Sequence, residues 1–198
     1  MTDPGEPAVA KDELRARLLA RRRARPPGER AAAADAVASA LLEGLRGVGT
    51  LAAFVPDPDE PGCGRLPEAY TGLGARVLLP VIPTQGRVLE WAAYTGELEA
   101  GRFGLSHPVG PRLGPTAIGA ADTVVVPALA VDSVGIRLGR GGGYYDRALV
   151  HARPDAVLVT VVFDDERVDR LPREIHDRPV TAVVTPSGGW EELAPPAG

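Results

Sequence analysis

The sequence is poor in the residues that build disulfides and zinc centres. Its 198 residues include one cysteine, Cys63, and three histidines that lie far apart, at His107, His151 and His176. A single cysteine cannot form a disulfide within the chain and is typical of proteins in a reducing compartment. We therefore expect a cytoplasmic protein, and the scattered histidines argue against a zinc site.

Long apolar runs and an excess of positive charge are also missing. The longest apolar run, residues 124–131, is interrupted by Pro127 and falls short of the roughly 18 to 20 residues of a membrane helix. No apolar stretch follows the arginines of residues 21–23, as an export signal would require. The net charge of −4 argues against general binding of nucleic acid. These absences predict a soluble protein that binds neither membranes nor nucleic acid.

The length and composition are those of one folded domain. Hydrophobic residues make up 44% of the chain and charged residues 24%, which is ordinary for a globular protein with a sizeable core. We expect a single domain over residues 1–198 and a monomer. Loose tails are expected at about residues 1–8 and 191–198, where proline, glycine and acidic residues accumulate.

Two helices are expected first along the chain, and an alternation of strands and helices follows. Leucines at helical spacing among arginines predict a helix over residues 9–25, and the alanine-rich segment 29–45 predicts a second. Short β-branched or apolar runs predict strands at residues 50–55, 76–80, 88–95, 123–126, 156–163 and 181–185. Further helices are expected at residues 66–73, 144–152 and 166–171.

This alternation indicates an α/β fold with a largely parallel sheet that is covered on both faces. Ligands of such sheets bind beyond the carboxyl ends of the strands. The strand expected at residues 123–126 leads into a glycine-rich segment, which therefore lies at that edge of the sheet. Loops at residues 56–64 and 103–115 are long enough to shape a pocket.

The glycine-rich segment at residues 135–147 is the most informative part of the chain. It holds five glycines, three arginines, two tyrosines and an aspartate. Glycine lets backbone N–H groups approach a ligand closely, and a helix starting at Gly143 or Tyr144 directs its positive end to the same place, so the segment predicts a phosphate-binding loop. It matches neither the Walker A pattern nor the dinucleotide fingerprint. A flexible turn is the alternative, but a turn has no use for so many arginines and tyrosines.

Lysine is nearly absent from the sequence. Of 22 basic residues, only Lys11 is a lysine. An ammonium is a compact point charge, and phosphate sites use it in a different geometry from the planar guanidinium of arginine. Lys11 is therefore a candidate phosphate ligand, and a lysine on a solvated helix face is the alternative.

These residues resemble the 5-formyltetrahydrofolate cyclo-ligase family, whose members are also called 5,10-methenyltetrahydrofolate synthetases. The most specific element is the run R-L-G-R-G-G-G-Y-Y-D at residues 137–146. Other family-like features stand around it in the same order: Lys11 and Arg15, Phe54 and Glu60, the run G-R-F-G at residues 101–104, and Asp177 shortly before the run V-V-T-P at residues 183–186. The resemblance thus covers most of the chain.

The resemblance implies a fold, a reaction and a cofactor. The fold is a three-layer α/β/α sandwich similar to that of sugar-phosphate isomerases and CoA transferases. The reaction converts 5-formyltetrahydrofolate and ATP into 5,10-methenyltetrahydrofolate, ADP and phosphate, with Mg²⁺. ATP phosphorylates the formyl oxygen, and the second folate nitrogen attacks the resulting iminium phosphate. Because alignment and charge neutralisation carry such a step, the chain needs no nucleophilic side chain, and no G-x-S-x-G serine or reactive Cys/His arrangement is found.

The resemblance also assigns roles residue by residue. It implies ATP contacts for Lys11, Arg15, Arg137, Leu138, Gly139, Arg140, Gly141, Gly142, Gly143, Tyr144 and Tyr145. It implies a folate slot formed by Phe54, Val55, Glu60, Phe103, Arg140 and Tyr144, with Glu60 at the polar pterin edge. It implies that Asp146 and Asp177 bind magnesium, an ion that takes carboxylate, water and phosphate oxygens.

Simpler roles remain open for several of these residues when they are considered alone. Asp146 could cap a helix or pair with Arg147, and Asp177 could be a turn residue. The aromatic residues could belong to the core. Three positions also depart from the family pattern and bear on secondary phosphate or metal contacts: Thr181 in place of an acidic residue, Gly142 in place of the lysine of some members, and His107 near a usual carboxylate.

Two rival hypotheses share the expected architecture, because a fold does not fix a function. One is a diverged relative that binds ATP but acts on another substrate or merely senses the nucleotide. The other is an enzyme like the sugar-phosphate isomerases or CoA transferases, which would not use ATP and, as an isomerase, would need an acid/base pair in the pocket.

Overall fold

The computed structural model describes residues 6–173 and 177–194. Its strands are β1 (Thr50–Ala52), β2 (Arg76–Val81), β3 (Glu90–Ala93), β4 (Leu98–Ala100), β5 (Ser106–Pro108), β6 (Thr123–Pro127), β7 (Ala130–Asp132), β8 (Arg137–Leu138), β9 (Val157–Val161), β10 (Arg167–Val168), β11 (Ala182–Thr185) and β12 (Gly189–Glu192). Its α-helices are α1 (Glu6–Ala24), α2 (Pro27–Gly44) and α3 (Tyr144–Leu149). Short 3₁₀ helices are η1 (Glu68–Leu73), η2 (Arg102–Gly104), η3 (Pro115–Ala120) and η4 (Asp164–Glu166).

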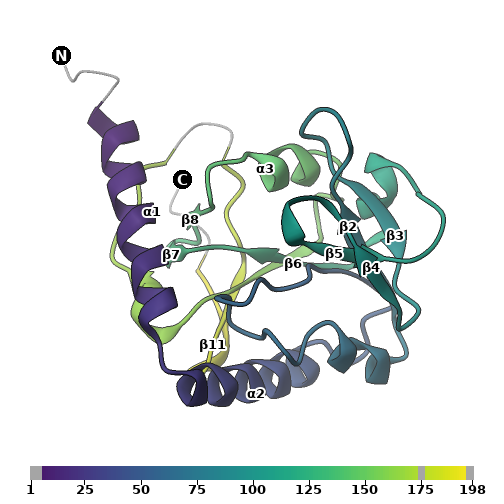
Figure 1. The fold of residues 1–198 in the computed structure, drawn as a ribbon, viewed down its shortest axis with the longest axis horizontal. Helices are drawn as coiled ribbons and strands as arrows, with labels where there is room; N and C mark the ends of the chain where they lie inside the picture. The colour runs from purple at the N-terminus through teal and green to yellow at the C-terminus, as the bar shows by residue number, and fades with distance from the viewer. Residues whose placement is uncertain (1–5, 174–176, 195–198) are drawn as a thin grey trace.

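A seven-stranded sheet forms the centre of the described part of the molecule (Figure 1). Its strand order is β12-β11-β9-β6-β1-β2-β3. The inner strands from β11 to β2 are all parallel to their neighbours. The edge strands β3 and β12 are antiparallel. The predicted α/β fold with a largely parallel sheet is therefore confirmed.

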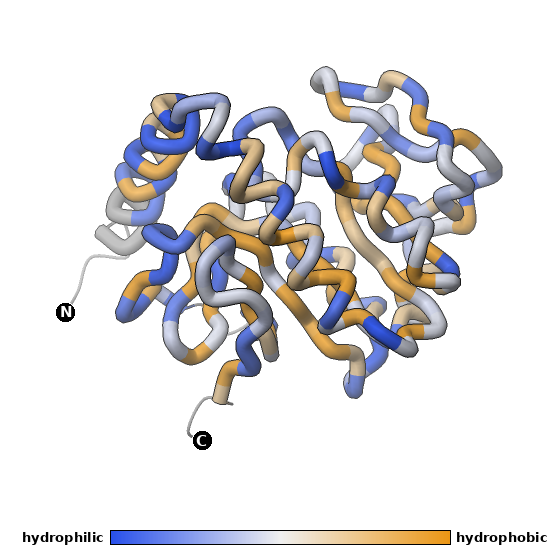
Figure 2. The backbone as a smooth tube through the Cα atoms, turned by 90° about the horizontal axis from the view of Figure 1, so that it is seen from below, coloured by the Kyte–Doolittle hydropathy of each residue, from blue (hydrophilic) through white to orange (hydrophobic). Residues whose placement is uncertain are grey.

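Each inner strand alternates its side chains between two buried faces, as a sheet covered on both sides requires. In β6, Val124 and Val126 belong to one apolar cluster and Val125 to another. The cluster around Val125 includes Val37 and Leu41 of α2. The opposite cluster includes residues of α3 and η3. This is the expected three-layer α/β/α sandwich, and Figure 2 shows its hydrophobic strands running through the middle of the molecule.

Several elements differ from the prediction in extent or type. The strand expected at residues 50–55 ends at Ala52, so that Phe54 and Val55 follow it as loop residues. The helix expected at residues 66–73 is the 3₁₀ helix η1. Strand β12 extends through Glu192, into the segment that we expected to be a tail.

The helix predicted at residues 166–171 is wrong. Glu166 ends η4, and the next two residues form β10, which pairs with β7. The Glu166 carboxylate accepts a hydrogen bond from the backbone N–H of Phe163 at 2.8 Å and is buried in an ion pair with Arg22. A side chain committed to these partners fixes a tight turn instead of the first turn of a helix.

A second, three-stranded sheet in the order β10-β7-β8 carries helix α1. Leu18 of α1 packs against Leu129, Ile136 and Leu138 in a separate apolar cluster. The sequence analysis missed this sheet because its strands contain only two or three residues. Since β8 opens the R-L-G-R run, the packing brings α1 beside the glycine-rich segment (Figure 1).

No helix in residues 6–173 and 177–194 is both long enough and apolar enough to cross a membrane.

Candidate active site

A cavity of about 510 Å³ opens at the carboxyl ends of the parallel strands. Phe54 follows β1, Ile82 follows β2 and Pro127 ends β6, and all three line the cavity. These strands are neighbours in the order β6-β1-β2. The cavity therefore lies where ligands bind in open α/β sheets.

Most of the predicted site residues meet in this one cavity. It is lined by Lys11, Arg15, Phe54, Val55, Glu60, Arg137, Leu138, Gly139, Arg140, Gly141, Gly142, Gly143, Tyr144, Tyr145, Asp146 and Asp177. Phe103 belongs to η2, but its side chain lies outside the part that the structure describes. Lys11 and Asp177, which are 166 positions apart in the sequence, thus meet at one edge of the sheet.

The glycine-rich segment connects strand β8 to helix α3 along one side of the cavity. Gly141 and Gly143 have φ angles of 90° and 66°, a left-handed conformation that side-chain-bearing residues rarely adopt. The carbonyl of Gly139 accepts a hydrogen bond from Arg15 Nε at 3.0 Å. This contact ties helix α1 to the segment and holds two predicted phosphate ligands next to each other.

Arg137 and the two predicted metal ligands form a charged group in the cavity wall. Arg137 pairs with Asp146 and donates a 2.8 Å hydrogen bond to the carbonyl of Arg178. Burial lowers the pKa of Arg137, and the charges of Asp146 and Asp177 oppose that shift. Both aspartates therefore lie close to the same guanidinium. Asp146 does not pair with Arg147, which instead donates to the carbonyl of Gly143 at 2.7 Å.

Glu60 is a buried carboxylate that also lines the cavity. Its Oε2 accepts a hydrogen bond from the backbone N–H of Asp57 at 3.0 Å. Its Oε1 accepts from Arg140 Nη2 at 3.2 Å and Nε at 3.3 Å. Burial raises the pKa of Glu60, and the positive charges of Arg140 and Arg22 and the bond from Asp57 oppose that shift. Glu60 is thus a desolvated acceptor held in place by cations.

The aromatic residues serve both the core and the cavity wall. Phe54 is buried in the cluster that also packs against α2, yet it lines the cavity. Tyr144 and Tyr145 are partly buried and do the same from α3. The buried hydroxyl of Tyr145 has no hydrogen-bond partner among the described residues. Burial also raises the pKa of Tyr145, so its phenol stays neutral.

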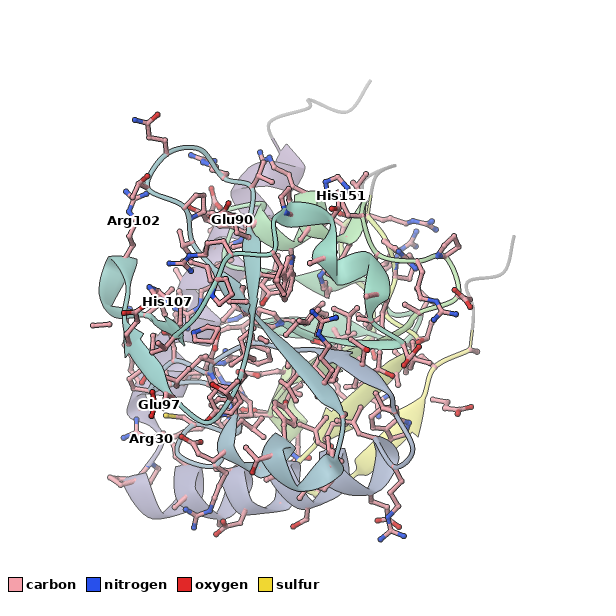
Figure 3. The ribbon with its side chains drawn as sticks, turned by 90° about the vertical axis from the view of Figure 1, so that its right-hand side faces the viewer. Arg30, Glu90, Glu97, Arg102, His107 and His151 are labelled. Atoms are coloured by element: carbon pink, nitrogen blue, oxygen red, sulfur yellow. The ribbon has the colours of Figure 1, made fainter. Side chains whose placement is uncertain are left out.

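A β4–β5 hairpin closes another part of the cavity wall with two residues that the sequence analysis mentioned but did not assign to the site. Arg102 and His107 both line the cavity and lie on one side of the molecule (Figure 3). Arg102 Nη1 donates to the carbonyls of Pro83 and Thr84 at 2.6 and 2.7 Å. His107 Nδ1 lies 3.5 Å from a carboxylate oxygen of Glu99.

Further lining residues were also missing from the predicted site: Asp57, Pro80, Ile82, Leu89, Leu105, Ser106, Pro127 and Ala128. Asp57 belongs to the loop at residues 56–64. Leu105 and Ser106 fall in the segment 103–115, which was expected to be a loop but contains strand β5, starting at Ser106. The length of these two segments was the available signal. Of the three departures from the family pattern, Gly142 and His107 line the cavity. Thr181 is not one of its lining residues, and its hydroxyl exchanges hydrogen bonds with the backbone of Leu158.

Within the described ranges, no cluster of three or more His, Cys, Asp and Glu side chains is arranged to hold a metal ion. A cation held here by Asp146 and Asp177 would need further oxygen ligands, such as water and phosphate.

Comparisons with known proteins agree with one another. Residues 7–186 match the profile of the 5-formyltetrahydrofolate cyclo-ligase family. The chain is 45% identical to the 5-formyltetrahydrofolate cyclo-ligase of Mycolicibacterium smegmatis over 186 residues, 91% of this chain and 95% of that protein. It is 34% identical to the protein of the same name from Escherichia coli K12 over 148 residues, 72% of this chain and 80% of that one.

Two solved structures have the same fold. The structure of Aquifex aeolicus 5,10-methenyltetrahydrofolate synthetase superimposes with a TM-score of 0.77 and 29% identity, covering 95% of each chain. That of the Mycoplasma pneumoniae 5,10-methenyltetrahydrofolate synthetase gives a TM-score of 0.69 at 18% identity, covering 87% of this chain and 96% of the other.

Proposed function

Because the chain belongs to the 5-formyltetrahydrofolate cyclo-ligase family, we propose that it catalyses the ATP- and Mg²⁺-dependent cyclisation of 5-formyltetrahydrofolate to 5,10-methenyltetrahydrofolate. The other products are ADP and phosphate. The observation that carries the proposal is that one cavity holds both the glycine-rich segment with its basic neighbours and the buried carboxylate of Glu60, which Arg140 of that segment contacts. The basic segment suits phosphates, and the desolvated carboxylate suits a polar heterocycle.

The phosphates of ATP bind between helix α1 and the glycine-rich segment. Lys11 and Arg15 contact them from α1, and Arg137 contacts them from the start of the segment. The backbone of residues 139–143 contributes N–H groups, which its glycines leave open to close approach. The hydrogen bond from Arg15 to the Gly139 carbonyl supports this arrangement, because it already joins the two elements.

The folate binds in the part of the cavity lined by Phe54, Val55 and Tyr144, with Glu60 at the pterin edge. A pterin presents N–H donors along one edge, and a desolvated carboxylate accepts such bonds strongly. Arg140 pairs with both Glu60 and Asp57. It therefore lies between the two substrates and contributes to both subsites.

Magnesium fits the residues present if it binds together with the nucleotide. Asp146 and Asp177 supply two carboxylates beside Arg137, and phosphate oxygens and water supply the remaining ligands that the ion prefers. When bound, Mg²⁺ offsets the negative charge on the transferred phosphoryl group. Without bound nucleotide and metal, the positive charge of Arg137 offsets part of the negative charge of the two carboxylates.

The residues of the chain act by alignment and neutralisation. The formyl oxygen attacks the γ-phosphorus, the bond to ADP breaks, and an iminium phosphate forms on N5. N10 then attacks the formyl carbon, loses its proton, and the carbon–oxygen bond breaks to release phosphate as the ring closes. Arg15, Lys11 and Arg137 neutralise the phosphoryl oxygens, and the apolar wall around Phe54 and Leu89 limits access of water.

The direct test follows methenyltetrahydrofolate absorbance with purified protein and 5-formyltetrahydrofolate. We expect product only when ATP and magnesium are both present, because the formyl oxygen is a poor leaving group until it is phosphorylated. A verified cyclo-ligase assayed in parallel is the positive control. Absence of product under conditions in which that enzyme works would remove the proposal. Isomerase or CoA-transferase activity without ATP would favour the second alternative, an enzyme like the sugar-phosphate isomerases or CoA transferases.

We also propose that the enzyme is cytoplasmic and monomeric.

A further inference from the structure

The run of arginines at residues 21–23 contains one residue that the fold buries completely. Arg22 is 0% exposed, although its neighbours Arg21 and Arg23 reach the surface. Its Nε and Nη2 each donate a 2.7 Å hydrogen bond to one oxygen of Glu166. Nη2 also donates to the carbonyl of Ala128 at 2.7 Å. Such a two-point pair fixes the guanidinium in one orientation.

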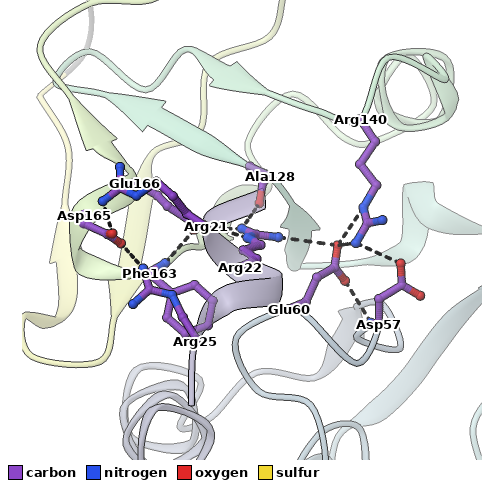
Figure 4. Close-up of polar contacts among 10 residues, drawn as sticks. All are labelled: Arg21, Arg22, Arg25, Asp57, Glu60, Ala128, Arg140, Phe163, Asp165 and Glu166. Carbon is purple, nitrogen blue, oxygen red and sulfur yellow. Dashed lines mark hydrogen bonds and ion pairs between the residues drawn. The ribbon is translucent and has the colours of Figure 1, made fainter. Parts of the chain in front are cut away.

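The remaining nitrogen of Arg22 faces the candidate active site. Nη1 is buried and has no hydrogen-bond partner among the described residues. It lies 3.9 Å from Oε1 of Glu60, which is an ion-pair distance but too long for a hydrogen bond (Figure 4). Charges interact more strongly in a buried site than in water. The fixed guanidinium therefore presents its free edge to the carboxylate assigned to the pterin.

Arg22 differs from Arg140, the other cation that contacts Glu60. The side chain of Arg140 is 43% exposed and also pairs with Asp57. It belongs to the glycine-rich segment and lines the cavity, where both substrates are proposed to bind. Arg22 is tied to Glu166, which lies on the side of the guanidinium away from Glu60, and Arg22 does not line the cavity (Figure 4). Of the two cations, Arg22 is the fully buried one, and Glu166 and the Ala128 carbonyl anchor it.

We propose that Arg22 is a positioning residue that acts through Glu60. Anchored by Glu166 and the Ala128 carbonyl, it holds the Glu60 carboxylate ionised and directed toward the pterin while Arg140 responds to the substrates. This inference rests on the proposed function, which assigns Glu60 to the pterin edge. Arg22 itself touches neither substrate.

The sign of the expected pH effect follows from the groups around Glu60. Those that act on its charge or share its surroundings come from four elements: Arg22 of α1, Arg140 of the glycine-rich segment, Tyr145 of α3, and Asp57 and Cys63 of its own loop. Burial raises the pKa of Glu60, and Arg22 opposes that rise. Removing Arg22 raises the pKa of Glu60 further. As the pH falls, folate binding that needs the ionised carboxylate is therefore lost at a higher pH than in wild type.

The kinetic test compares Arg22→Met and Arg22→Lys with wild type. We expect Arg22→Met to raise the KM for 5-formyltetrahydrofolate about tenfold, to leave the KM for ATP within about twofold, and to move the acid limb of the folate kcat/KM profile up by about one pH unit. Arg22→Lys keeps the positive charge, so its KM for folate and its pH profile should lie between those of Arg22→Met and wild type. Arg21→Met is the matched control, because Arg21 pairs with Asp165 on the surface and makes no contact with Glu60.

A second variant and a second measurement keep the inference falsifiable. If Arg22→Met leaves Glu166 unpaired and unstable, Arg22→Met combined with Glu166→Gln removes the stranded charge while the amide oxygen still accepts from Phe163 N–H. The pKa of Glu60 can be measured without substrate, by NMR of carbon-13-labelled glutamate carboxyls with Glu60→Gln to identify the signal. We expect a rise of about one unit on loss of Arg22.

The outcomes separate the two proposals. If wild-type protein forms no methenyl product, the proposed function fails, and an Arg22-dependent pKa of Glu60 still supports the electrostatic link. If wild-type protein is active but the Glu60 pKa and the folate KM are unchanged in the folded variants, the inference is overturned. A lower kcat would also overturn it if the KM values for both substrates and the pH profile stayed unchanged, because that is the result of a purely structural role.

Discussion

Replacement of Asp146 by asparagine should lower turnover at least about a hundredfold while the melting temperature stays close to that of wild type. The change keeps the size of the side chain and removes the negative charge that offsets the cation. The Asp146 side chain is 41% exposed, and its buried partner Arg137 keeps the nearby charge of Asp177 and its hydrogen bond to the Arg178 carbonyl, so we expect the variant to stay folded. Asp177→Asn should behave in the same way. Magnesium-dependent turnover and thermal unfolding are to be measured on both variants.

A matched control separates the metal role from the loss of a surface ion pair. Asp155 pairs with Arg153 at 2.5 Å and lies outside the cavity, so Asp155→Asn should retain turnover. Raising the magnesium concentration should partly restore the cavity variants and have no effect on the control. Normal activity in Asp146→Asn and Asp177→Asn, or a loss fully explained by unfolding, would remove the metal assignment.

Replacement of the lone lysine should weaken ATP binding more than folate binding. We expect Lys11→Ala to raise the KM for ATP about tenfold or more, as the loss of a charge-assisted contact of roughly 1.5 to 3 kcal/mol implies. Lys11→Arg should not restore wild-type behaviour, because a planar guanidinium does not occupy the position of a compact ammonium. Steady-state kinetics with each substrate varied in turn would measure both effects.

Arg17→Ala is a suitable control for the lysine variants. Arg17 is an exposed basic residue on the same helix, and it does not line the cavity. The KM for ATP should be unchanged in this variant. Equal KM values for ATP in Lys11→Ala, Lys11→Arg and wild type would contradict the phosphate contact and favour the alternative, in which Lys11 lies on a solvated helix face.

The five inner strands of the seven-stranded sheet, its edge strand β3 and the location of the site followed from local sequence patterns. Residues 123–126 form an apolar run that can only be buried, and the glycine-rich segment comes after it, so its position at the carboxyl edge could be predicted. The ordered motifs then named residues that the fold brings to one cavity, with Phe103 outside the described side chains. The roles of these residues remain predictions, because position alone does not test binding.

The parts that could not be predicted depend on contacts between distant segments. Arg22 and Glu166 are 144 positions apart, and neither has a local pattern that marks it as buried. Charged residues in a helix and in a turn are usually solvated, so the pair was invisible before the fold was known. The three-stranded sheet escaped detection for a similar reason, since strands such as β8 are too short to have a period of their own.

The central claim is that the cavity couples phosphoryl transfer from ATP to ring closure of the folate. It is tested most directly with 5-formyltetrahydrofolate that carries oxygen-18 in its formyl group. If the formyl oxygen attacks the γ-phosphorus, each phosphate released with a molecule of methenyltetrahydrofolate contains one oxygen-18 atom, which mass spectrometry detects. Unlabelled phosphate formed in step with the product would contradict the account, because ATP would then be hydrolysed by water and would not activate the formyl group.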